Sequence, residues 1–219
     1  MDPEVLNAYF PLYIQAFWLT VKIGWLGIAL SLVIGAIAAF TLHFRIPLFA
    51  KITAVYVELF RNTPLLVQLF FIYFALPKIG VSLSAESCGV LGLGLLGGSY
   101  MAEAFRSGLD SIPASQTQSA LALGMKRSQM FRYVIFPEAL TISVPAVVAN
   151  MIFLLKETSV FSAISLMDLM FTAKDLIGLY YNTTEALFML VIFYVVMLLP
   201  VSVLGSLAEK KVRYRSFGV

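Results

Sequence analysis

The sequence predicts an all-α integral membrane protein with five transmembrane helices. Of the 219 residues, 60% are hydrophobic and only 12% are charged, and the mean hydropathy is +0.91. A soluble domain carries about 25% charged residues, so this chain has too little polar surface to cover a water-exposed globule. Several apolar stretches also reach about 20 residues, the length of a helix that crosses a bilayer. We therefore expect a single membrane domain over residues 1–219.

Five stretches are long and apolar enough to cross the membrane. The first begins earlier than its most apolar part, near Leu12, and the second is more polar than the others. The predicted spans are Ile23–Leu42, Thr53–Leu76, Cys88–Phe105, Ala139–Leu155 and Ala186–Ala208. An odd number of spans places the two termini on opposite sides of the membrane.

The loops differ in their content of basic residues, and this difference predicts the orientation. Cytoplasmic loops carry an excess of Lys and Arg. One set of loops and ends holds Arg45, Lys51, Arg106, Lys126, Arg127, Arg132, Lys210, Lys211, Arg213 and Arg215, whereas the other holds Lys78 and Lys174. We expect the N-terminus outside, and the C-terminus and the segment at about 113–137 in the cytoplasm.

The stretch "GLGLLG" (Gly92–Gly97) fits the G-x-G-x-x-G pattern of dinucleotide-binding folds. That interpretation requires a preceding strand and a βαβ unit, and these glycines lie inside a predicted span. Gly94 and Gly98 instead have the spacing of small residues that allow helices to pack closely.

The sequence offers little for metal, redox or hydrolytic chemistry. His43 and Cys88 are the only histidine and cysteine, which excludes a disulfide framework and a histidine-rich metal site. No G-x-x-x-x-G-K-[ST] phosphate-binding loop is present. We therefore expect no metal site, no cofactor, no catalytic residue and no nucleic-acid partner.

The second span contains charged residues and a proline where an apolar helix is expected. Pro64 has no N–H, so it cannot satisfy the Phe60 carbonyl group of a continuous helix. Backbone freed in this way is tolerated where it lines a cavity, as in the broken helices of transporters. The residues concerned are Glu58, Arg61, Asn62, Thr63 and Pro64. Glu58 and Arg61 are three residues apart and can also pair on one helix face.

A long polar segment, Gln116–Ala139, interrupts the apolar chain. Ser115 and Gln118 have the spacing of a capping box, and Gly124 is a natural end for the short helix that follows. Ser128 can cap a second short helix, which Pro137 closes. On this pattern alone, an amphipathic hairpin lying on the lipid surface stays an alternative.

The polar segment resembles a loop shared by membrane subunits of ATP-binding-cassette (ABC) importers, with the pattern E-A-A-x3-G-x9-I-x-L-P. The matching residues here are Gln118, Ser119, Ala120, Gly124, Val134, Phe136 and Pro137. The resemblance implies that this loop inserts into a groove on a separate cytoplasmic ATPase, which binds the ATP. Met125, Phe131 and Tyr133 would then be apolar anchors for the ATPase.

Other stretches resemble the polar amino acid permeases of that superfamily. They are "YVELFRNTPLLVQLFFIYFALP" (Tyr56–Pro77), Tyr100–Met125, "FRYVIFPEAL" and "LLKETSVFSAIS". The resemblance implies the transmembrane fold of type I ABC importers in a bacterial inner membrane. It also implies partners: ATPase subunits, an extracytoplasmic amino-acid-binding protein and a second permease subunit. Because Gln118 replaces the glutamate of the pattern, both a homodimer and an unequal pair stay open.

An amino acid zwitterion requires an anion for its ammonium group and donors for its carboxylate. We expect Glu157, with Lys156, Thr158 and Ser159, in the cargo pathway, opposite Arg61, Asn62 and Thr63. The alternative is that Glu58–Arg61 and Lys156–Glu157 are structural ion pairs. Glu103 with Arg106 is predicted to anchor the inner end of the third span.

Ser159–Thr184 is predicted to form an amphipathic helix across the outer mouth of the pathway. The expected function is a permease subunit without its own ATPase site in an importer of polar amino acids. An ion-coupled secondary transporter of small polar solutes is the alternative, because Glu58 and Glu103 lie at membrane depth. A membrane enzyme and a membrane scaffold fit less well, because the one histidine is near the cytoplasmic edge and a scaffold does not explain the broken second span.

Overall fold

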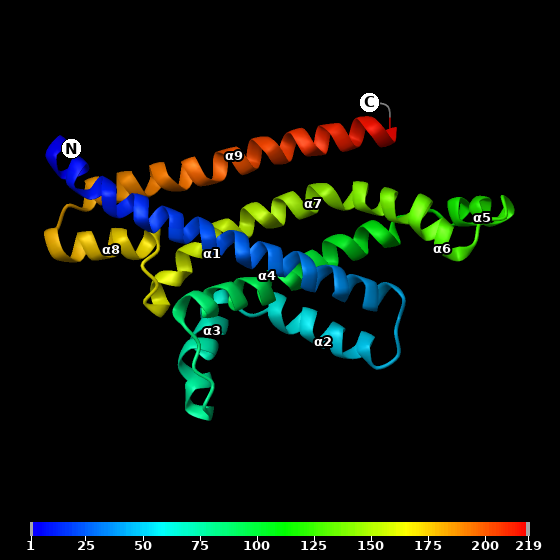
Figure 1. Cartoon of the computed structure of the whole chain (residues 1–219), viewed down its shortest axis with the longest axis horizontal. Helices are drawn as coiled ribbons and strands as arrows, with labels where there is room; N and C mark the ends of the chain where they lie inside the picture. The colour runs from blue at the N-terminus through cyan, green and yellow to red at the C-terminus, as the bar shows by residue number, and fades with distance from the viewer. Residues whose placement is uncertain (1, 218–219) are drawn as a thin grey trace.

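The structure, a computed structural model, describes residues 2–217, and the side chains of residues 2–212. Within that part every regular element is helical (Figure 1). The elements are α1 (Pro3–His43), α2 (Phe49–Arg61), α3 (Leu65–Phe70), η1 (Phe71–Ala75), η2 (Leu76–Ile79), α4 (Ala85–Asp110), α5 (Ala114–Ala122), α6 (Arg127–Met130), η3 (Phe131–Ile135), α7 (Phe136–Glu157), η4 (Thr158–Ile164), α8 (Leu169–Tyr180) and α9 (Thr183–Phe217). The side chains of Arg213 and Arg215, which contribute to the predicted orientation, lie outside the described side chains.

Four helical segments among the described residues are long and apolar enough to cross a membrane. They are Pro3–His43, Ala85–Asp110, Arg127–Ile164 and Thr183–Val212. A bent pair, Phe49–Arg61 with Leu65–Ile79, provides a fifth if the two helices count as one span. The predicted fold class, an all-α membrane protein, is therefore confirmed, and the second span is the irregular one.

The first and third spans pack together more extensively than any other pair of elements. A methyl group added at Gly94 would lie 2.5 Å from Leu30, and one added at Gly98 would lie 2.6 Å from Ile34. These distances are too short for real carbon atoms, so only glycine allows α1 and α4 to approach this closely. The predicted role of Gly94 and Gly98 in close helix packing is confirmed.

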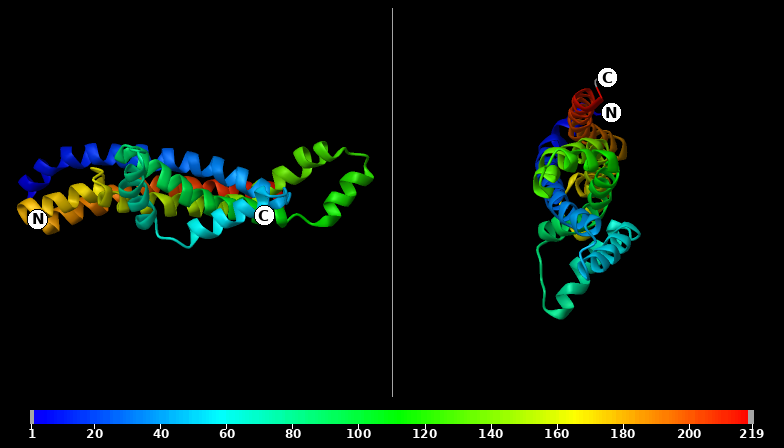
Figure 2. Two further views of the ribbon diagram at one scale, coloured as in Figure 1. Left: turned by 90° about the horizontal axis from the view of Figure 1, so that it is seen from below. Right: turned by 90° about the vertical axis from the view of Figure 1, so that its right-hand side faces the viewer.

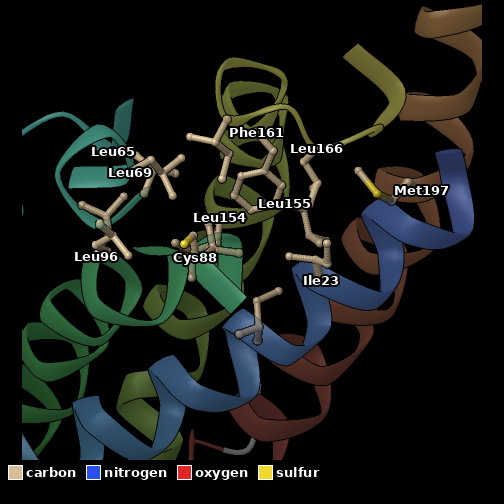
Figure 3. Packing of buried hydrophobic residues seen from close by; sticks show 14 of the residues in the cluster. Ile23, Leu65, Leu69, Cys88, Leu96, Leu154, Leu155, Phe161, Leu166 and Met197 are labelled. Carbon is tan, nitrogen blue, oxygen red and sulfur yellow. The ribbon is translucent and has the colours of Figure 1, made fainter. Parts of the chain in front are cut away.

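The main hydrophobic core lies where α1, α3, α4 and the end of α7 meet (Figure 3). Leu65 and Leu69 point from α3 into this core and are 2% and 0% exposed. Leu154 and Phe161 reach it from the other side and are fully buried. The start of α3 is therefore fixed to the bundle, whereas the following η1 and η2 project sideways from it (Figure 1).

The polar segment is a hairpin that extends beyond the end of the bundle opposite the N-terminus (Figures 1 and 2). Gly124 follows α5 with a φ of 76°, so the predicted glycine end of this helix is confirmed. The predicted caps are wrong: Pro113 is the N-cap of α5 and makes no side-chain capping bond, and Lys126 precedes α6. The N–H of Lys126 donates to Gln129 Oε1 at 2.9 Å.

Pro137 does not close the second helix of the hairpin. α6, η3 and α7 follow one another without a break, and Pro137 lies in the first turn of α7. The turn before it, η3, is π-helical, with the Phe136 N–H bonded to Phe131 O, and such a local π-helical adjustment accommodates a proline within a membrane helix. The hairpin is thus a direct extension of the fourth span.

The segment between the fourth and fifth spans folds into η4 and α8, at the end of the bundle where α1 begins (Figure 1). Asp168 caps α8, and its Oδ1 accepts a hydrogen bond of 2.9 Å from the Phe171 N–H. The Leu169 N–H donates to Thr20 Oγ1 at 3.1 Å. The expected single amphipathic helix across 159–184 is therefore two shorter helices, one of which is fixed to α1.

Candidate functional site

The second span breaks at the predicted residues. α2 ends at Arg61, α3 begins at Leu65, and the helices on the two sides of the break differ in direction by 107°. Polar side chains satisfy carbonyl groups in the last turn of α2: Asn62 Nδ2 donates to Glu58 O at 2.8 Å, and Thr63 Oγ1 donates to Leu59 O at 2.8 Å. The break is thus an ordered structure with its own hydrogen bonds.

A cavity of about 400 Å³ lies beside this break. It is bounded by the break itself, by α4 and by the C-terminal end of α7 with the start of η4. The lining residues are Arg61, Asn62, Thr63, Pro64, Leu65, Leu66, Leu96, Tyr100, Phe153, Glu157 and Val160. The structure therefore brings Arg61, Asn62 and Thr63 together with Glu157, which is 96 residues from Arg61 in the sequence.

The cavity contains charged groups of both signs. The Arg61 guanidinium lies 5.5 Å from the centre of the Tyr100 ring, and its Nη1 lies 3.7 Å from Glu103 Oε2. Glu157 is half-buried, and no described residue forms an ion pair with it. The cavity thus contains one anion without an ion-pair partner among the described residues, Glu157, and one cation, Arg61, whose ion pair with Glu103 is long.

Behind Arg61, a row of ionic contacts follows α4 toward the hairpin end of the bundle. Glu103 Oε2 lies 2.8 Å from Arg106 Nη2. Arg106 Nη1 lies 3.2 Å from Asp110 Oδ2, and Asp110 Oδ1 lies 2.8 Å from His43 Nδ1. The predicted pairing of Glu103 with Arg106 is confirmed. We call Arg61, Glu103, Arg106, Asp110 and His43 the ionic row.

The two structural ion pairs that the sequence left open do not form. Arg61 contacts Glu103 instead of Glu58, because Glu103 approaches it from α4. Glu58 Oε2 accepts a hydrogen bond of 3.1 Å from Asn62 Nδ2. Lys156 and Glu157 are consecutive residues, which point in different directions on a helix.

Four of the predicted pathway residues do not line the cavity. Glu58 accepts a hydrogen bond from the cavity-lining Asn62 but does not line the cavity itself, and Lys156 is exposed. Thr158 is fully buried and donates to Leu155 O at 2.7 Å. Ser159 is half-buried and accepts through its backbone oxygen from Ser162 Oγ at 3.4 Å. Their role in a cargo pathway stays a prediction.

Sequence reasoning missed the aromatic wall of the cavity, Tyr100 and Phe153. Their ring centres lie 5.2 Å apart, and Asn150 Nδ2 donates to the Tyr100 backbone oxygen at 3.3 Å. A membrane helix carries aromatic residues on its lipid face as well as on buried faces, so their residue type gave no signal.

The hairpin places its predicted ATPase-contact residues in different environments. Gln118, Ser119, Gly124 and Pro137 are exposed, Met125 is half-buried and Ala120 is buried. Phe131 packs within the chain, with its ring centre 5.9 Å from that of Phe44 and 6.0 Å from that of Phe136. The most exposed apolar side chains near the tip are Leu123 and Tyr133, at 80% and 65%. Sequence reasoning missed Leu123.

The base of the hairpin is fixed by a polar contact. Gln116 Nε2 donates to Glu138 Oε1 at 2.9 Å, which joins α5 to the start of α7. Among the described residues, no group of three His, Cys, Asp or Glu side chains is arranged so that it could hold a metal ion.

A bundle of apolar helices around a broken span, with a charged cavity and a polar hairpin at one end, defines a membrane transport subunit. Residues 31–214 match the family "Binding-protein-dependent transport system inner membrane component", and the chain belongs to this family. It is 31% identical to the probable amino-acid permease protein YxeN of Bacillus subtilis over 96% of this chain and 95% of that protein. It is 32% identical to the glutamine transport system permease protein GlnP of Escherichia coli, over 93% and 94% of the two chains.

Solved structures give the same fold. An amino acid ABC transporter crystallised with histidines has a chain that superposes with a TM-score of 0.89 and 32% identity, covering 96% of this chain and 99% of that one. A chain of the MetNI methionine ABC transporter, at 21% identity, superposes with a TM-score of 0.79. The fold is that of the transmembrane domain of type I ABC importers.

Proposed function

We propose that this chain forms the translocation pathway of an ATP-driven importer for polar amino acids. The observation that carries the proposal is the cavity at the broken span, where Arg61 and Glu157 provide unlike charges. A zwitterion needs both, since its carboxylate accepts hydrogen bonds from a guanidinium and its ammonium donates to a carboxylate. One relative is named for glutamine transport, and one solved amino acid transporter is described with histidines, which supports a polar amino acid as cargo.

ATP is bound and hydrolysed by a separate ATPase subunit that contacts the hairpin. The exposed Leu121 and Leu123 of the tip, at 48% and 80%, are suited to an apolar groove on that partner. Because α6, η3 and α7 are continuous, a movement of the hairpin is passed directly to Glu157 at the far end of α7. Coupling of this kind works only if the cargo binds the outward- and inward-open states with different affinity.

The remaining partners follow from the two other surfaces of the chain. η4 and α8 form the outer end, where an extracytoplasmic binding protein would deliver the amino acid. The arm formed by η1 and η2 exposes Phe71 and Phe74 at 64% and 52%, which supports pairing with a second permease subunit, identical or not. The chain would lie in a bacterial inner membrane with its N-terminus outside.

Copurification followed by reconstitution tests this function. We expect the chain, extracted from native membranes, to bring with it an ATPase and, in an unequal pair, a second permease. In proteoliposomes with the binding protein, one polar amino acid should stimulate ATP hydrolysis. If no ATPase copurifies and no amino acid stimulates hydrolysis, the proposal is wrong.

A further inference from the structure

Gln68 is a buried polar residue in the otherwise apolar helix α3, whose sequence is LLVQLF. It is 8% exposed and does not line the cargo cavity. It borders instead a neighbouring apolar groove, which Thr63 also lines. Gln68 thus lies behind the break, on the side away from the cavity. A polar side chain in such a place requires a structural or functional reason, because burying an amide is costly unless it is hydrogen-bonded.

The amide of Gln68 joins the two sides of the break. Its Nε2 lies 3.0 Å from Phe60 O, 3.1 Å from Thr63 O and 2.9 Å from Thr63 Oγ1. In a continuous helix, Phe60 O would accept from the N–H of residue 64, but that residue is Pro64. The Gln68 side chain therefore provides the donor that proline removes.

The orientation of the amide follows from its partners. All three neighbours of Nε2 are oxygen atoms, two of them carbonyl oxygens, so the NH₂ group must face the break. The other end, Oε1, is buried and has no hydrogen-bond partner among the described residues. An apolar side chain of the same size would fill this space without leaving a buried acceptor unpaired. The donor end is thus the reason for an amide at this position.

The residues between Phe60 and Gln68 are those that line the cavity from this side. α2 ends at Arg61, and Asn62 and Thr63 follow, so their positions depend on the path of the chain through the break. Leu65 and Leu69 fix α3 in the core (Figure 3). A bond from α3 back to Phe60 and Thr63 consequently sets the position of Arg61 relative to the bundle and to Glu157.

We propose that Gln68 is a positioning residue for the cargo site: its side-chain NH₂ holds the break in the second span, so that Arg61, Asn62 and Thr63 face the cargo. This inference rests on the proposed function. Gln68 acts through these residues and does not touch the cargo itself. A role in packing alone would instead be met equally well by an apolar residue of similar shape.

The test compares variants in the complex reconstituted with its ATPase and binding protein. Gln68→Met keeps the size of the side chain and removes the donor, and Gln68→Asn keeps a donor with a shorter reach. Leu69→Met is the matched control, since Leu69 is a fully buried neighbour on α3 with no polar role. The readouts are uptake kinetics, ATP hydrolysis without cargo, and assembly.

We expect Gln68→Met to raise the KM for the amino acid about tenfold, the effect of about one lost hydrogen bond to the site. ATP hydrolysis without cargo and assembly of the complex should stay unchanged in this variant. The KM of Gln68→Asn should lie between those of Gln68→Met and wild type. The KM of Leu69→Met should stay within about twofold of wild type. A Gln68→Met variant with wild-type KM, or with a lower maximal rate only, would overturn the inference.

If Gln68→Met does not assemble, Gln68→Asn decides: a raised KM with normal assembly supports the inference, and an unchanged KM contradicts it. Failure of both variants to assemble would assign Gln68 to folding and overturn the inference. Failure of the proposed function is recognised separately, because the wild-type complex would then show no amino-acid-stimulated hydrolysis.

Discussion

Among the individual residues, the two charged side chains of the cavity, Arg61 and Glu157, differ in their contacts. Arg61 contacts Glu103 and lies over the Tyr100 ring, whereas Glu157 has no ion-pair partner among the described residues. An unpaired carboxylate in a membrane helix is costly and usually serves a cavity or a partner. Glu157 is therefore the group most available to the ammonium of a cargo.

Neutralising Glu157 should separate its role from that of its neighbour. We expect Glu157→Gln to reduce uptake by about tenfold or more, because the ammonium loses a charged partner. Lys156→Gln is the comparison, since Lys156 is exposed and does not line the cavity, and wild-type uptake by this variant would remove Lys156 from the predicted pathway. Uptake of labelled amino acid, normalised to inserted protein, measures both. Equal uptake by Glu157→Gln and wild type would remove Glu157 from the site.

Asp168, the N-cap of α8, gives this part of the chain a defined pH dependence. Burial raises the pKa of its carboxyl group from 3.8 to about 7, against the lowering effects of backbone hydrogen bonds and of Lys174. Tyr194 on α9 is the other titratable group that interacts with it. Because the folded state holds the proton more tightly than the unfolded state, this contribution to stability is complete below about pH 4 and is lost as the pH rises through 7.

Thermal unfolding in detergent between pH 5 and 8 checks this expectation. Asp168→Asn keeps a capping side chain and removes the titration, so its melting temperature should fall less with rising pH than that of wild type. Asp175→Asn, an exposed carboxylate on the same helix, should leave the profile unchanged. If the melting temperatures of Asp168→Asn and wild type fell equally with rising pH, Asp168 would not be the source of the pH dependence.

The sequence predicted the cavity only where residue type is unusual for a membrane span. Arg61, Asn62, Thr63 and Glu157 are polar, so they stand out in an apolar stretch and were found. Tyr100 and Phe153 are not unusual in such a stretch, and their part in the cavity depends on how α4 and α7 rotate against each other. The contact of Arg61 with Glu103 likewise crosses from α2 to α4, which no local spacing indicates.

At the element scale, the packing of α1 against α4 depends on glycine. A methyl group at Gly98 would lie 2.6 Å from both Ile34 and the Tyr56 hydroxyl, and that hydroxyl donates to Leu95 O at 2.7 Å. The same glycine therefore allows α1 and α2 to approach α4. Gly178 on α8 has no atom within 4 Å of such a methyl group.

Alanine at these two positions should have opposite effects. We expect Gly98→Ala to lower the free energy of unfolding by about 1–3 kcal/mol through overpacking. Gly178→Ala should be neutral or should stabilise by up to about 1 kcal/mol, because alanine favours a helix over glycine. Unfolding of the two purified variants in detergent, followed by circular dichroism, measures the difference. A Gly98→Ala variant as stable as Gly178→Ala would show that the close approach is not required.

The helices were predicted better than their ends. Apolar runs identified the spans, but α4 and α9 extend beyond the predicted limits through polar turns that carry no hydropathy signal. α1 begins at Pro3, before the predicted start near Leu12. The caps at Ser115 and Ser128 were wrong, since Pro113 and Lys126 take the capping positions. The break at Pro64 was predicted correctly, because a missing N–H is a local property of the residue.

In the whole molecule, the cavity and the hairpin are joined by a continuous helix and by a row of side-chain contacts. α7 connects the hairpin to Glu157, and the ionic row connects the neighbourhood of Arg61 to His43 at the C-terminal end of α1. The hairpin extends from the end of the bundle opposite the N-terminus (Figure 2), and Leu123 near its tip is 80% exposed. This arrangement supports the proposal that an ATPase bound at the hairpin acts on cargo in the cavity.

Uptake into proteoliposomes that contain the complete complex, with ATP or an ion gradient supplied separately, is the most direct measurement. We expect labelled amino acid to enter only with ATP, and we expect Leu123→Asp to abolish uptake while the protein stays inserted, because a charge cannot enter an apolar groove on the ATPase without a large cost. Uptake driven by an ion gradient without ATP, or ATP-driven uptake unaffected by Leu123→Asp, would contradict a transport pathway driven through the hairpin.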